Sequence, residues 1–186
     1  MVITVPLCAA FWQMVSTPEP PQLGPGPRPG VLERREIESR LDRFVADHEL
    51  PADAALRLRA TALLYHDQHD PAHDLVQDLS DGDGALIHAM LHRREPDYWN
   101  AKYWFRRVEG HPVYLSLGRR ISATPDAPES PSLVRELTLP GAFDPFAFVD
   151  LCEREQRSPD DAPAVRWLRG VQQAEFEELV RHLSAV

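Results

Sequence analysis

The sequence predicts an all-α protein of stacked helical hairpins, about seven helices in total, preceded by a proline-rich N-terminal arm. Apolar residues recur at helical spacing from residue 31 to the end of the chain. Asp-Pro pairs at 70–71 and 144–145 are typical helix starts. A chain of 186 residues suits one domain, so we expect an arm over 1–30 and a single helical domain over 31–186.

The first 30 residues divide into two parts. MVITVPLCAAFWQMV is apolar, but it is shorter than the ~20 apolar residues that span a bilayer and has no preceding basic residue. We therefore expect it to pack on the domain. Residues 16–30 hold six prolines and three glycines, which excludes a regular helix or sheet. This stretch is either disordered or extended along the surface with Leu23 as an anchor.

Beyond the arm, helix-favouring segments follow one another. We expect helices over 31–50, 51–68, 70–79, 85–95, 98–108, 146–156 and 164–183. The glycines at 82 and 84 mark a turn, and Asp97 is placed to cap the helix that follows Pro96. Residues 112–122 fit a helix or a strand, residues 123–132 are a proline-rich loop, and 133–141 alternate as a short strand does.

Composition limits the function. The net charge of -9 argues against a nucleic-acid or anionic-membrane binder, because both need a basic face. Cys8 and Cys152 are too few for a disulfide framework, and their apolar surroundings indicate free thiols, which fits a cytoplasmic protein. The sequence has no Glu-x-x-His or His-Glu-x-x-His pair, no phosphate-binding glycine loop, no dinucleotide fingerprint and no nucleophile elbow.

The strongest candidate site lies on the expected helices at 85–95 and 98–108. His88, His92 and Glu95 share one helical sector, opposite the apolar one, and could bind a divalent metal or act as acid and base. Tyr103 joins them as a candidate catalytic phenol. Candidate ligand-binding residues on the same segment are Arg93, Arg94, Asp97, Asn100, Trp104 and Arg107. The alternative is that these polar residues form an ordinary solvated face.

A second polar cluster precedes it. His66, His69 and His73 alternate with Asp67, Asp70 and Asp74, but Pro71 falls among them and is expected to interrupt the helical phase. TALLYHD resembles the metal-dependent phosphohydrolases of the HD type, which are all-helical and use a His-Asp pair on a metal. Gln68 and His69 follow the pair here in place of that family's glycine-containing turn, and only His48 could stand for its other histidine.

Two further resemblances concern the helix after Pro96. PDYWNAKYWFRRVEGHP is similar to the second helix of a tetratricopeptide unit, and HDPAHDLVQDL resembles a poorer copy about 27 residues earlier, against the usual ~34. The motif HRRE-x-D-x-x-NAKYW resembles a family of small bacterial and fungal proteins of uncharacterised function, over roughly residues 55–155. That resemblance implies that residues 92–104 act as one unit and implies no activity.

Three hypotheses follow. The first is a helical protein whose polar pocket binds a small anionic ligand or a metal, with hydrolysis or isomerisation as the chemistry and a divalent metal as the only cofactor considered. The second is a non-catalytic, tetratricopeptide-like module that binds a partner segment. The third is that Arg93 or Arg94 pairs with Glu95 or Asp97 simply to hold the hairpin together. A homo-oligomer is compatible with each of them.

Overall fold

A computed structural model describes residues 6–123 and 131–185, and it confirms the all-α prediction. The described residues form ten helices and one two-stranded hairpin. The helices are α1 (Leu7–Val15), α2 (Arg34–Asp47), α3 (Ala52–Tyr65), α4 (His69–Val76), α5 (Gly82–Arg94), α6 (Tyr98–Phe105), α7 (Pro112–Ser122), α8 (Pro131–Leu137), α9 (Pro145–Glu155) and α10 (Pro163–Leu183). The strands are β1 (Thr138–Leu139) and β2 (Ala142–Phe143), which pair antiparallel.

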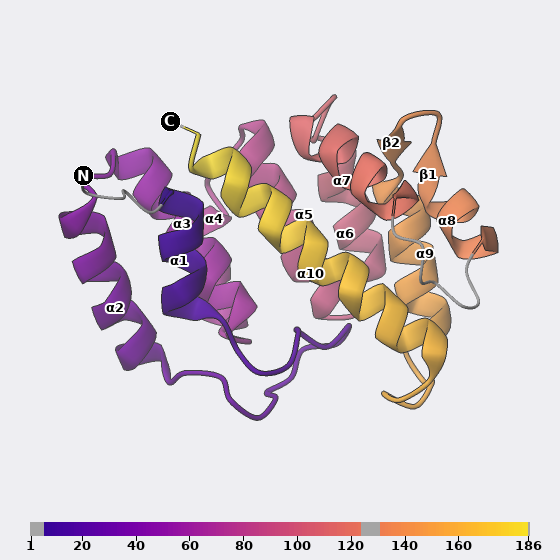
Figure 1. Cartoon of the computed structure of the whole chain (residues 1–186), viewed down its shortest axis with the longest axis horizontal. Coiled ribbons are helices and arrows are strands. Elements are labelled where there is room, and N and C mark those ends of the chain that lie inside the picture. Colours follow the sequence, from indigo (N-terminus) through magenta and orange to yellow (C-terminus); the bar gives the residue numbers. More distant parts are fainter. Residues whose placement is uncertain (1–5, 124–130, 186) are drawn as a thin grey trace.

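The long helix α10 joins two halves of the core. In Figure 1 it runs diagonally across the molecule, from the end that holds α8 and α9 to the end that holds α1 and α2. Phe176 and Leu179 of its second half pack into the cluster built by α1 to α6, whereas Leu168 and Val171 of its first half pack with α7, α8 and α9. The apolar stripe of this helix therefore stabilises both halves at once.

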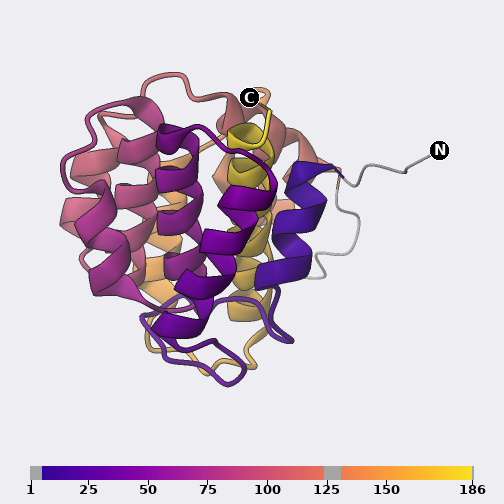
Figure 2. The same cartoon turned by 90° about the vertical axis from the view of Figure 1, so that its left-hand side faces the viewer.

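The N-terminal arm packs on the domain. Phe11 and Val15 of α1 are completely buried between α2 and α10. The segment that follows α1 is extended and folds back along one end of the bundle (Figure 2), where Leu23 and Arg28 are buried. Leu23 is thus the predicted anchor.

The chain between α7 and α9 differs from expectation. Residues 112–122 are a helix, and the expected strand at 133–141 is instead α8 followed by the short hairpin. Gly118 explains why α7 lies against β2, because a Cβ there would come within 2.6 Å of the backbone carbonyl carbon of Ala142. Most of the expected proline-rich loop, residues 124–130, lies outside the described residues.

Helix α5 is the central element of the fold. Asp81 caps its start by accepting a hydrogen bond from the backbone N–H of Gly84. It packs on α3, α4 and α6, and every residue from Gly84 to Arg94 is buried. The polar sector with His88 and His92 is therefore covered by neighbouring helices, which contradicts the alternative of an ordinary solvated face. None of the helices in the described ranges combines the length and hydropathy needed to cross a bilayer.

Candidate metal centre

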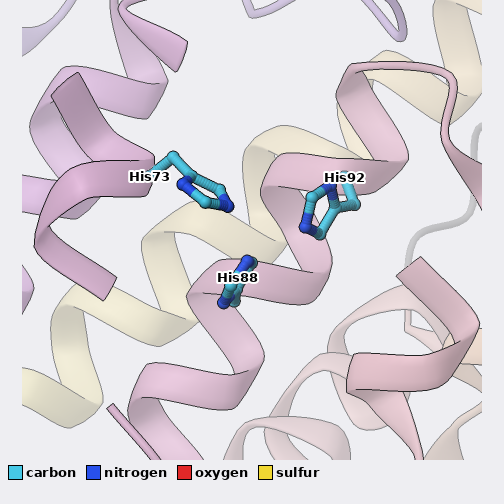
Figure 3. Close-up of side chains that lie close together, drawn as sticks. All are labelled: His73, His88 and His92. Carbon is cyan, nitrogen blue, oxygen red and sulfur yellow. The ribbon is translucent and has the colours of Figure 1, made fainter. Parts of the chain in front are cut away.

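Three histidines meet where α4 packs against α5. His73 comes from α4, and His88 and His92 lie one turn apart on α5. One ring nitrogen from each lies within 4.8 Å of the others. In Figure 3 the His73 ring points from its helix toward the two rings on α5. Because His88 and His92 are buried and His73 is half-buried, the cluster is open to solvent on the side of His73.

His88 has an unusual environment for a buried polar ring. Neither Nδ1 nor Nε2 has a hydrogen-bond partner, although both are inaccessible to solvent. The indole of Trp104 stacks on the ring with centroids 3.9 Å apart. Burial, with the neighbouring His92 and His73, lowers the pKa of His88 to about 3. The ring is therefore neutral at physiological pH, which is the form that binds metal ions.

His92 is held in one orientation by two neighbours. Its Nδ1 lies 3.0 Å from Oε2 of Glu95, and its Nε2 lies 3.1 Å from Nδ2 of Asn100. The hydrogen bond from His92 is the main cause that lowers the pKa of Glu95, so this carboxylate is ionised and can only accept. Nδ1 of His92 therefore donates a hydrogen bond to Glu95, and Nε2 accepts one from the Asn100 amide nitrogen, which can only donate.

This arrangement brings together three side chains that could hold a metal ion, at distances somewhat longer than those of a metal site. Imidazole nitrogens bind Zn²⁺ at about 2.0–2.1 Å, which places ligand nitrogens of a tetrahedral site about 3.4 Å apart. From a spread of at most 4.8 Å the ligand nitrogens need to approach one another by up to about 1.4 Å. Glu95 would then be the carboxylate that orients a ligating histidine through its second nitrogen.

Glu95 is therefore not one of the three clustered side chains, in contrast to the expected ligand set of His88, His92 and Glu95. Its carboxylate contacts Nδ1 of His92, and the residue that completes the cluster is His73. The sequence spacing does not place His73 with His88 and His92, because Pro71 is expected to interrupt the helical phase of its segment. In fact α4 begins at His69 and Pro71 lies in its first turn, where backbone N–H groups need no helical partner.

The other histidines of that segment serve different purposes. His66 follows the end of α3, is buried, and accepts a hydrogen bond from the backbone N–H of Leu32 through Nδ1. His69 donates from Nε2 to the carbonyl of Pro25, and its Nδ1 lies 4.0 Å from Glu95. The arm therefore reaches the edge of the histidine cluster through His69.

Asn100 and Trp104 are the residues of α6 that touch the cluster. Tyr103 and Arg107 lie on the exposed side, where Nη1 of Arg107 donates to the Tyr103 hydroxyl at 3.3 Å. The Arg107 guanidinium also lies 5.2 Å from the Trp104 ring centroid. Tyr103 and Arg107 thus border the site through Trp104, and within the described residues no hydrogen bond, ion pair or ring contact joins either to a histidine of the cluster.

Arg93 and Arg94 are fully buried and stabilise the fold, in contrast to the expectation that they bind a ligand. Arg93 pairs with Glu175 of α10 at 2.5 Å and lies over the Phe148 ring. Arg94 pairs with Asp67 at 2.6 Å and donates to three backbone carbonyls. Neither uses Glu95 or Asp97, the partners expected from their proximity in the sequence.

Asp97 has the expected capping role. Its carboxylate accepts from the backbone N–H of Asn100 at 3.2 Å and begins α6. This use leaves no reason to assign it to a ligand.

A second group of metal-ligating side chains joins α5, α7 and α10. Oδ1 of Asp83 lies 2.7 Å from Nε2 of His111 and 3.0 Å from Nε2 of His182. Nδ1 of His111 accepts from the backbone N–H of Val113, so its Nε2 carries the proton that it donates to Asp83. His111 has no free lone pair, and this group is a hydrogen-bonded link between helices.

No protein-family model, no curated protein and no solved structure matches this chain.

Proposed function

We propose that the protein binds a divalent transition metal ion, with zinc as the first candidate, through His73, His88 and His92. The observation that carries the proposal is the pair of unpartnered, buried nitrogens on His88, next to two further imidazoles. A buried polar atom without a hydrogen bond costs about 1–3 kcal/mol, so such an atom needs an explanation. A bound cation supplies a partner for the nitrogen that carries the lone pair.

The set of ligands favours a reactive site over a purely structural one. Three neutral nitrogen ligands leave a fourth position open, as in catalytic zinc sites, where the metal lowers the pKa of its bound water to about 7. The exposed guanidinium of Arg107, beside Trp104, provides a cation for an anionic group of a substrate. We therefore propose hydrolysis of a small anionic substrate as the activity of the site.

Metal titration tests the binding step. We expect the metal-depleted protein to bind one Zn²⁺ per chain in calorimetry, and to give the visible absorption bands of low-symmetry Co²⁺ when cobalt replaces zinc. His88→Leu should abolish both signals, whereas His48→Leu, which changes an exposed histidine outside the cluster, should leave them unchanged. Absence of binding in the unmodified protein, or equal binding by His88→Leu, would refute the proposal.

An association surface on α6 is the second candidate function. Trp99 is 75% exposed and Tyr103 is 41% exposed, and their rings stack on each other. Exposed aromatic residues are enriched where proteins bind partners. The simplest partner to test is a second copy of this chain: sedimentation equilibrium should show a dimer that Trp99→Ser dissociates, and a monomer at all concentrations would contradict self-association.

A further inference from the structure

Asn100 is the only asparagine of the sequence, and its side chain contacts the candidate metal centre. It lies on α6, half-buried, with its backbone N–H engaged by the Asp97 cap. Its Nδ2 is 3.1 Å from Nε2 of His92. The side chain is thus available to interact with the cluster and is not needed to begin its own helix.

The direction of this hydrogen bond follows from its donor. Because an amide nitrogen can only donate, Nε2 of His92 is the acceptor and carries a lone pair, while Nδ1 lies against Glu95. The Asn100 amide therefore donates into this lone pair. It is also the lone pair that a metal ion needs, since Nδ1 is occupied by Glu95.

Metal and amide cannot use this lone pair together. A zinc ion would lie about 2.1 Å from Nε2, whereas the amide nitrogen already lies 3.1 Å from the same atom. A metal on this axis would be far too close to the N–H group of Asn100. His88 has no such competitor, because both of its nitrogens are unpartnered.

We propose that Asn100 is a latch that competes with the metal for Nε2 of His92 and so sets the affinity of the site. This inference rests on the proposed three-histidine metal site. The metal first gains His73 and His88, and it completes its ligand set only when the Asn100 side chain rotates away. The latch keeps His92 hydrogen-bonded while no metal is bound and raises the metal concentration at which the site fills.

Asn100 as a metal ligand is the alternative, and it predicts the opposite change in metal affinity when Asn100 is replaced. If the amide turned over and its Oδ1 bound the metal, Asn100 would be a fourth ligand and its removal would weaken binding. As a latch, its removal strengthens binding.

The test is a Zn²⁺ titration of the full-length, metal-depleted protein against a competing chromophoric chelator. For Asn100→Ala we expect a Kd about three- to tenfold lower than for the unmodified protein, the factor that corresponds to losing one hydrogen bond. Gln77→Ala removes an exposed amide at the C-cap of α4 and serves as the matched control, with an unchanged Kd. Asn100→Ser is the second variant, with the same expectation, should the alanine variant not fold.

A second readout separates a latch from general loosening. Asn100→Ala should lower the thermal midpoint of the metal-free protein and tighten metal binding. A generally loosened site would lower both the thermal midpoint and the metal affinity. An unchanged or raised Kd in the variants would overturn the latch and leave the metal site intact. Absence of Zn²⁺ binding by every variant and by the unmodified protein would overturn both.

Discussion

Replacing Asp67 with asparagine should destabilise the protein strongly, because this carboxylate is the counterion of two buried arginines. Its side chain is 1% exposed and accepts from Nη1 of Arg28 at 2.6 Å and from Nη2 of Arg94 at 2.6 Å. The backbone N–H of Arg28 adds a third bond at 3.0 Å. Asparagine keeps the shape and tolerates the positive φ of 61° at this position, so the substitution removes the charge and replaces one of the two accepting oxygens by a donor that faces an N–H group.

The magnitude follows from these contacts. Two hydrogen bonds between charged groups are worth about 1.5–3 kcal/mol each, and breaking a buried ion pair costs about 3–5 kcal/mol. We expect Asp67→Asn to lose about 3–5 kcal/mol of unfolding free energy in urea, which corresponds to a thermal midpoint lower by roughly 10 °C for a chain of this size. Hydrogen exchange at the Arg28 amide should accelerate, because this N–H donates to Asp67.

The matched control is Asp78→Asn, which changes an exposed aspartate and should be neutral within about 0.5 kcal/mol. If Asp67→Asn unfolds within that margin of the control, the arm is not anchored by this charge and the reasoning fails.

Three further predictions concern buried polar groups. Glu95→Ala should weaken Zn²⁺ binding by about 10- to 100-fold in a chelator competition, because His92 loses its orienting carboxylate. An unchanged Kd would show that the orientation of His92 does not depend on it. Arg93→Met should cost about 3–5 kcal/mol in urea unfolding by leaving Glu175 buried and unpaired, whereas the double change with Glu175→Leu should recover most of it; equal loss in both would contradict this. The pKa of His66 is lowered to about 4, mainly by burial, so the unfolded chain takes up this proton first and stability falls as pH drops from 6.5 to 4. The unfolding free energies of the unmodified protein and His66→Leu should converge by about 3 kcal/mol over that range, and a pH-independent difference would argue against a neutral His66.

Much of the fold could be predicted because its signals are local. The apolar stripe of α10, the caps Asp97 and Asp144, and the anchor Leu23 depend on residues close in sequence or on simple burial. The alternation of apolar and polar side chains predicts a strand at residues 133–137, and this prediction is wrong. The structure buries Leu133 and Leu137, four residues apart, on one side of a helix. Short segments of this kind are decided by the surface they pack on.

The candidate site could be predicted only in part, for a related reason. His88, His92, Asn100 and Trp104 were expected together because they lie on adjacent helices of one hairpin. His73 belongs to the preceding helix, and the register of α4 against α5 cannot be obtained from either segment alone. Pro71 lies in the first turn of α4, where proline is tolerated, so it does not interrupt the helix. This position is the sequence feature from which the placement of His73 could have been predicted.

His88 connects the stability of the fold with the proposed function. Its two nitrogens are buried without partners, so an apolar side chain of similar size would remove a cost of about 1–3 kcal/mol for each unpaired atom. Part of this gain offsets the loss of stacking on Trp104, worth about 0.5–1.5 kcal/mol. We therefore expect His88→Leu to raise the unfolding free energy of the metal-free protein by roughly 1–5 kcal/mol in urea while it abolishes Zn²⁺ binding. A gain of stability with loss of binding is what a site maintained for function predicts. If His88→Leu instead destabilises the metal-free protein, the imidazole is a structural part of the core, and the main argument for a metal at this position is lost.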